Sequence, residues 1–207
     1  MLNRLVRRWI LLCVVLIGGA VPAHAGMPLI LPRPGQIGFT LQGQYGDLLK
    51  SGLMGNEFGS GAGLAVRLRY RMRFERALGL SFESQKMDVR GTPVPPPSPA
   101  PDTTRVSVSL LLSGAEFYQL FNTDQNIQEM VSIGAGLAQV HYALGDGDTE
   151  YPLAGDGLYL SAGFGLERFF YRSFAFDVST RYLSIFHDGH VNHDLQASVG
   201  IIFYASY

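Results

Sequence analysis

The chain has 207 residues, of which 47% are hydrophobic and only 16% are charged. That charged fraction is low for a soluble domain, and the formal net charge of −1 gives no reason to expect nucleic-acid binding. The length suggests one domain or a small pair of domains.

The N-terminal residues have the pattern of a secretory signal peptide. Three arginines within residues 4–8 form a basic head, residues 9–20 form an apolar core, and an Ala-His-Ala step at 23–25 offers a cleavage site. We expect residues 1–25 to be removed, because the apolar run is short for a membrane anchor. The remaining chain has 16 − 3 = 13 basic and 17 acidic side chains, a formal charge of −4, and no cysteine, since the single Cys13 lies in the signal.

Apolar and polar residues then alternate with a period of two in eight segments of the chain. These segments are residues 37–45, 63–72, 77–89, 104–117, 129–142, 158–167, 174–187 and 194–207. Such alternation is typical of strands with one apolar and one polar face. No run within residues 26–207 approaches the roughly 18 apolar residues that a membrane-spanning helix needs.

Two of these segments depart from simple alternation. In 104–117 we assign the apolar face to every second residue, with Leu111 breaking the pattern: Val106, Val108, Leu110 and Leu112, opposite Arg105, Ser107, Ser109 and Ser113. In 129–142 the phase slips after Leu137, because Gln139 and His141 follow on the apolar face. A bulge, or the emergence of the strand from an apolar layer, would produce that slip.

The connections between the segments alternate in length. The links at 46–58, 91–103 and 145–157 are long, and the link at 187–193 is moderate. Between them lie short links at 73–76 and 171–173 and a moderate one at 121–128. An even number of strands joined by alternating long and short links describes an up-and-down barrel. The long links would then all lie at one end of the barrel.

The polar face of the segments is too charged for the core of a soluble protein, because an unpaired buried ion costs several kcal/mol. We assign it to a crowded, plugged lumen whose charged members are Arg67, Arg69, Glu83, Arg105, Glu167, Asp177 and Arg181. The apolar face suits lipid, and only a closed barrel satisfies the backbone of a sheet in a bilayer. The fold class predicted is all-β, an eight-stranded antiparallel up-and-down transmembrane β-barrel.

The signal pattern, the eight alternating segments, the alternating link lengths and the last strand together resemble the small outer-membrane β-barrel proteins of Gram-negative bacteria, the OmpA/OmpX type. The resemblance implies a barrel over 37–207, preceded by a short periplasmic segment at 26–36. It implies an outer-membrane location, contact with outer-membrane lipid and lipopolysaccharide, and termini in the periplasm with the long links outside.

The chain ends on a strand with one clean apolar face and an aromatic last residue. In the family that it resembles, such a strand is the signal read by the barrel-assembly machinery. Gly200, Phe203 and Tyr207 would carry this signal here.

Two links contain residues with metal-binding chemistry. His187, His190 and His193 have the right side chains for a transition-metal site, but their spacing matches no known zinc motif. We therefore keep them as candidate ligands only, and predict no metal and no cofactor. The acidic link with Asp146, Asp148, Glu150 and Asp156 opens like a calcium loop but lacks the glycine and closing glutamate at the required spacing.

Some eight-stranded barrels are lipid A deacylases, which use a His-x-Ser step near the last strands. Here His187 is followed by Asp188 and His193 by Asp194, and Ser184 falls on the opposite strand face from His187. We therefore predict a non-enzymatic protein with a structural or surface-interaction role through its outer loops, whose partner stays open. The alternatives are an enzyme that modifies outer-membrane lipid and a soluble periplasmic ligand-binding β-barrel.

Overall fold

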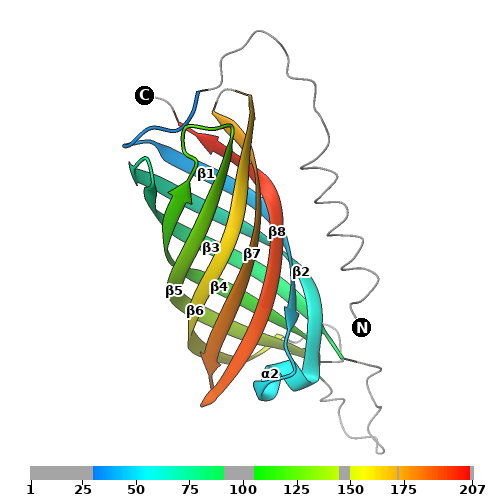
Figure 1. Ribbon diagram of the computed structural model, residues 1–207. Coiled ribbons are helices and arrows are strands. Elements are labelled where there is room, and N and C mark those ends of the chain that lie inside the picture. Colours follow the sequence, from blue (N-terminus) through cyan, green and yellow to red (C-terminus); the bar gives the residue numbers. More distant parts are fainter. Residues whose placement is uncertain (1–29, 91–104, 145–149, 172, 206–207) are drawn as a thin grey trace, which may run out of the picture.

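The computed structural model describes residues 30–90, 105–144, 150–171 and 173–205. Within these ranges eight antiparallel strands form a closed barrel in which each strand pairs with its neighbour in sequence and β1 pairs with β8 (Figure 1). The strands are β1 (Ile37–Leu48), β2 (Phe58–Arg73), β3 (Arg76–Val89), β4 (Arg105–Phe121), β5 (Ile127–Leu144), β6 (Glu150–Tyr171), β7 (Phe174–His187) and β8 (His190–Tyr204), with a short helix α2 (Gly52–Glu57) between β1 and β2. The predicted eight-stranded up-and-down barrel is confirmed.

The two ends of the barrel differ in what they carry. β1 begins and β8 ends at the same end, which we call the terminus end, and α2 lies at the opposite end, which we call the α2 end (Figure 1). At the terminus end β2 and β3 are joined through residues 74–75 and β4 and β5 through residues 122–126. The first link is short and the second is moderate, as the sequence predicted.

The link predicted at residues 187–193 is wrong. β7 and β8 form a tight hairpin whose two central residues, Asp188 and Gly189, have φ values of 49° and 72°. Left-handed conformations at both positions match the twist of the flanking strands, and Asp-Gly is a preferred sequence for such a turn. His190 and His193 therefore belong to β8.

Several strands are longer than a bilayer requires. β5 has 18 residues and β6 has 22, whereas about 9–11 tilted residues cross the hydrocarbon layer. β6 begins at Glu150 rather than near residue 158 as predicted, so that most of the expected link at 145–157 is strand. The extra length lies at the α2 end.

Side chains alternate strictly between the interior and the outer surface. In β3 every second residue from Ala77 to Met87 is buried and the residues between them are exposed. Large apolar side chains cover the outer surface, among them Leu64 and Ile133, which are 63% and 59% exposed. A continuous exposed apolar surface of this kind marks contact with lipid or a partner rather than with water.

The face assignment for β4 is wrong, because its apolar residues point into the barrel. Leu110 and Leu112 are each 1% exposed, and Val108 is fully buried, whereas Leu111 on the opposite face is 46% exposed. The phase slip in β5 begins without a bulge, since Gln139 pairs with Leu111 and with Asp156 in unbroken register. The pairing with β6 shifts only further on, between Val140 and Tyr142. The outer face of the strand leaves the apolar belt of the barrel surface instead, which is the second of the two causes given for the slip.

Candidate functional site

A charge network fills the part of the interior toward the terminus end. Its arginines come from β2 and β7, and its acids from β3, β4, β6 and β7: Arg67, Arg69, Arg71 and Arg181, with Glu83, Glu116, Glu167 and Asp177. Each of these side chains belongs to a residue that is at most 5% exposed. Four positive and four negative groups balance, which is the condition under which buried ions are tolerated.

One half of the network is centred on Glu167. Its carboxylate contacts the guanidinium of Arg69, lies 3.4 Å from Arg71 Nη2, and accepts a hydrogen bond of 3.0 Å from the hydroxyl of Tyr204. Arg69 Nη2 also lies 3.3 Å from Asp177 Oδ2. A single carboxylate thus compensates two arginines, and a tyrosine fixes its orientation.

The other half joins β2, β3, β4 and β7. Arg67 Nη2 lies 3.3 Å from Glu83 Oε1, and Arg67 Nε lies 3.9 Å from Glu116 Oε2. Arg181 contacts both of these acids, and the Tyr118 hydroxyl donates to Glu116. Each acid is therefore shared between two arginines that come from opposite sides of the barrel.

Two tyrosine rings contact arginines of the network, and the contact of Tyr118 with Arg69 joins the two halves. The guanidinium carbon of Arg69 lies 4.2 Å from the centre of the Tyr118 ring, and that of Arg71 lies 5.2 Å from the centre of the Tyr204 ring. Such cation–π contacts strengthen when they are desolvated. The network is therefore continuous across the barrel, and side chains occupy the narrow space that eight strands enclose.

The structure places six of the seven predicted lumen residues in this network, and the side chain of the seventh, Arg105, lies outside the described part of the chain. The prediction omitted Arg71, Glu116, Tyr118 and Tyr204. Arg71 lies on the same face of β2 as Arg67, because the two residues are four positions apart. It could therefore have been predicted from the sequence. The prediction omitted Glu116 because this residue shares a face with Leu110 and Leu112, which were assigned to lipid. An acid is not expected on a lipid-facing surface, so Glu116 was a sign in the sequence that this face points inward.

An apolar layer fills the interior toward the α2 end. It is made of fully or nearly fully buried side chains: Leu48, Met54, Phe58, Met87, Val108, Leu110, Leu112, Ala138, Val140, Tyr159, Leu183 and Ile185. Burial of one such leucine contributes about 1.5–3 kcal/mol. This part of the barrel is built like the core of a soluble protein.

The outer surface also changes along the strands, in the opposite sense. One cross-strand row of outward residues, which we call the border row, ends the apolar belt: Phe82, Ser113, Leu137, Leu158, Phe186 and Val191. Beyond it, toward the α2 end, the next rows on β3 to β6 are mostly polar: Ser84, Leu111, Gln139 and Asp156, then Lys86, Ser109 and His141. β7 and β8 end near the border row, whereas β3 to β6 continue past it along their own length. We call this continuation of β3 to β6 the projecting wall.

Helix α2 packs against β8 and β2 at the α2 end of the barrel. Met54 lies in the apolar layer, and its backbone N–H donates to Asn192 Oδ1 on β8 at 2.9 Å. Arg90, which follows β3, donates to the carbonyl oxygens of Gly55 at 3.1 Å and Phe58 at 2.7 Å. It also lies 3.1 Å from Asp47 Oδ1. Helix and arginine together close the α2 end of the barrel.

The three candidate histidines do not converge. His187 is buried and points inward, His190 is exposed at the start of β8, and His193 lies on the outer face. In the part of the chain that the structure describes, no group of three or more histidine, cysteine or acidic residues is arranged to hold a metal ion. Asp146 and Asp148 of the acidic link, and the side chain of Glu150, lie outside the described residues.

His193 instead takes part in a hydrogen-bonded group that the sequence did not indicate. Its Nδ1 lies 2.7 Å from the Tyr182 hydroxyl and 3.2 Å from the Ser184 hydroxyl, both on β7. The rings of Tyr182 and His193 stack with centres 5.5 Å apart. The group lies within the outer belt, with Ser184 opposite Leu160, one row from Leu158 of the border row. It brings a serine and a histidine together on the lipid-facing surface.

The residues proposed as the assembly signal lie on both faces of β8. Phe203 is outward and 41% exposed, whereas Gly200 faces inward. A Cβ atom on Gly200 would lie 2.7 Å from the Cα atom of Gln42 on β1, so only glycine permits this strand approach. Tyr207 lies outside the described residues.

Among the described residues no helix is long and apolar enough to cross a membrane. The closed barrel, its exposed apolar belt and its charged interior define the class: the protein is an eight-stranded β-barrel of the outer-membrane type. The belt places the chain in the outer membrane, where such barrels occur.

Solved structures share this fold. Neisserial surface protein A is 15% identical, with a TM-score of 0.53 over 81% of this chain and 96% of that chain. The outer membrane protein OprG of Pseudomonas aeruginosa is 13% identical, with a TM-score of 0.58 over 87% and 100%. Ail, the attachment invasion locus protein of Yersinia pestis, is 15% identical, with a TM-score of 0.50 over 82% and 99%.

The sequence itself matches no family model and no curated protein. At these identities the structural likeness extends to the fold alone. Function has to be argued from the residues of this chain.

Proposed function

We propose that the protein is a non-enzymatic outer-membrane barrel that serves as a surface-interaction scaffold. The observation that carries the proposal is the exchange of polarity at the border row. Inside the belt the barrel has an apolar outside and a charged interior; beyond it, β3 to β6 have a mostly polar outside and an apolar interior. A β-structure of the second kind is built to stand in water.

The proposal orients the α2 end toward the exterior of the cell. Both ends of the barrel lie at the terminus end, together with the links that follow β2, β4 and β6. The links that follow β1 and β3 at the α2 end are longer, although the β7–β8 turn at that end is tight. Short turns face the periplasm in this class of protein. The projecting wall then presents its hydroxyl, amide and mixed charged groups outside the membrane. The interior also supports the proposal, because side chains fill it. A filled interior favours a role in surface contact over a role in transport.

The direct test is a binding assay on cells that display the protein. Wild type is compared with a variant that carries Ser84→Asp, Ser109→Asp and Gln139→Asp on the outer face of the projecting wall. Cells are applied to surfaces coated with polysaccharides or with host extracellular proteins. We expect wild-type cells to adhere to at least one coating and the variant to lose that adhesion at equal surface abundance.

The matched control for this assay is a triple substitution inside the belt that keeps its apolar character, Leu80→Ile, Ile133→Leu and Leu160→Ile. It should adhere like wild type. Adhesion equal to that of cells without the protein on every coating would contradict a surface-interaction role.

A second candidate function is modification of outer-membrane lipid at Ser184 and His193. A histidine within 3.2 Å of a serine hydroxyl can accept its proton when the serine attacks an ester. Tyr182 opposes this role, because its hydroxyl is closer to the same nitrogen, at 2.7 Å, and one lone pair serves one donor. We therefore rank lipid modification second. The group of Tyr182, Ser184 and His193 is assigned instead to anchoring the barrel at the membrane surface.

The two functions are separated by an acyl-release assay with purified barrel and outer-membrane lipids. The scaffold proposal expects no release from wild type, from Ser184→Ala or from Tyr182→Phe. Acyl release from wild type that disappears in Ser184→Ala would establish the lipid-modifying enzyme and overturn the non-enzymatic proposal.

A further inference from the structure

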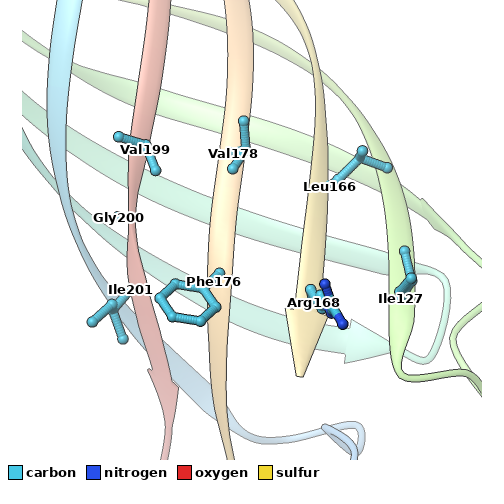
Figure 2. Close-up of a pocket in the computed structure, with 8 residues that line it drawn as sticks. All are labelled: Ile127, Leu166, Arg168, Phe176, Val178, Val199, Gly200 and Ile201. Carbon is cyan, nitrogen blue, oxygen red and sulfur yellow. The ribbon is translucent and has the colours of Figure 1, made fainter. Parts of the chain in front are cut away.

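A groove of about 160 Å³ crosses the outer surface near the terminus end. It lies on β6, β7 and β8 and touches the start of β5 (Figure 2). Leu166, Val178 and Val199 form one cross-strand row of its lining, and Arg168, Phe176 and Ile201 form the next row. The lining is apolar except for the guanidinium of Arg168.

The hollow arises from the sizes of these side chains. Two valines stand side by side in the first row, next to the longer Leu166, and Phe176 rises beside them in the second. Between Val199 and Ile201 the inward Gly200 exposes only backbone to the groove. A lipid-facing surface with even side chains would have no such depression, and the volume of this one, about 160 Å³, can hold part of an acyl chain.

The groove ends among aromatic rings. Phe170 and Phe176 stack with centres 4.4 Å apart, and the rings of Phe174 and Phe203 lie 4.8 Å apart. Aromatic girdles of barrels lie at the level of the lipid headgroups. Arg168 is three positions before the end of β6 at Tyr171, so its guanidinium lies at headgroup depth.

We infer that this groove binds one glycerophospholipid of the periplasmic leaflet, with an acyl chain over Val178 and Val199 and the phosphate on Arg168. The planar guanidinium suits two hydrogen bonds to phosphate oxygens. The assignment to the periplasmic leaflet rests on the proposed orientation, in which the terminus end of the barrel faces the periplasm.

The probe for this site is a phosphatidylethanolamine, added to the folded barrel in detergent and followed by native mass spectrometry. We expect one bound lipid at concentrations where diacylglycerol, which lacks the phosphate, does not bind. Arg168→Gln should weaken phosphatidylethanolamine binding about tenfold, since it removes a charge-assisted contact. Val178→Phe, which fills the hollow, should weaken it by a similar factor.

Two matched controls keep the charge and size changes but move them away from the groove. Arg76→Gln removes an exposed arginine at the start of β3, and Val131→Phe enlarges an outward valine on β5. Both should bind like wild type. Equal binding of diacylglycerol, or equal losses in the Arg76 and Arg168 variants, would overturn the site. All variants are first checked for folding by the mobility difference between boiled and unboiled samples.

The binding result is independent of the surface-interaction role, because it is measured in detergent on isolated barrel. The orientation is measured separately, by labelling a tag near Ser98 on intact and lysed cells. Labelling of lysed cells alone would reverse the orientation and assign the groove to the outer leaflet. That outcome would overturn the periplasmic leaflet named here even if Arg168 binds phosphate.

Discussion

Glu167 shows how single residues determine the state of the barrel interior. Its carboxylate is fully buried and is shared by Arg69 and Arg71, with Tyr204 as an additional donor. Because the surrounding charges balance, the loss of one acid leaves a buried arginine without compensation. The cost of such a loss exceeds the gain that the pair itself contributes.

We expect Glu167→Gln to lower the free energy of unfolding by about 3–5 kcal/mol, since the variant keeps the shape but not the charge. Urea unfolding of the barrel in lipid vesicles measures this difference. Glu129→Gln, on the exposed outer face, is the control and should change little. Similar losses in both variants would show that the buried pairs do not stabilise the fold.

A second residue-scale prediction uses depth along one strand face. Ile133 and Gln139 both point outward on β5, on opposite sides of Leu137 in the border row. Ile133→Arg should lower the free energy of unfolding by about 2–4 kcal/mol because it puts a charge into the hydrocarbon layer, and Gln139→Arg by about 0–1 kcal/mol. The same urea titration compares them. Equal costs would mean that the border row does not mark the membrane surface.

At the scale of the element, β4 is a strand that passes through two surroundings. Near its C-terminal end Glu116 and Tyr118 point into the charged interior, and near its N-terminal end Leu110 and Leu112 point into the apolar layer. The face of each side chain follows the period of two throughout. Only the preferred polarity of that face changes along the strand.

The inward orientation of the apolar residues of β4 is tested by two neighbouring substitutions. Leu110→Asp should lower the free energy of unfolding by at least about 3 kcal/mol, because it removes a buried leucine and adds an unpaired buried acid. Ser109→Asp, one position away on the outer face, should stay within about 0.5 kcal/mol. A larger loss of unfolding free energy for Ser109→Asp than for Leu110→Asp would support the face assignment predicted from the sequence.

The same strand explains how far the sequence predicts this protein. Alternation and link lengths were enough for the number and order of strands, because pairing between consecutive strands is local. The faces of most strands followed from assigning apolar residues to lipid. That rule failed where β4 leaves the membrane, since apolar residues there avoid water by turning inward. The Ser184–His193 contact was also invisible, because it depends on the register between β7 and β8.

At the scale of the whole molecule, the interior is closed in three successive ways. The charge network fills the part toward the terminus end, the apolar layer follows, and α2 with Arg90 covers the α2 end. An interior of eight strands has room only for side chains. Buried side chains therefore occupy the interior in each of these parts of the barrel.

We therefore expect no stable conductance from wild-type barrel in planar-bilayer recordings. A variant that combines Leu110→Ala, Leu112→Ala and Leu183→Ala opens the apolar layer but leaves the charge network in place, and it should also stay closed. Large, weakly selective and long-lived channels from wild type would refute the plugged interior.

The pairing of β1 with β8 has a consequence for the order of folding. Seven of the eight seams join strands that are consecutive in the chain, and this one joins Gly38 with Tyr204 and Leu48 with Asp194. Loop-closure entropy opposes contacts between such distant residues until the intervening strands have assembled. The sheet is therefore expected to exist first in an open form.

An open sheet has two unpaired edges, β1 and β8, and such edges invite pairing with another chain. Gly200 lies in this seam, where a side chain would press against the backbone of β1. A substitution such as Gly200→Val would then slow closure as well as destabilise the closed seam, since it obstructs the last step and not the strands already formed. The time that the sheet spends open, more than the stability of the finished barrel, would decide how much of this protein aggregates before it is complete.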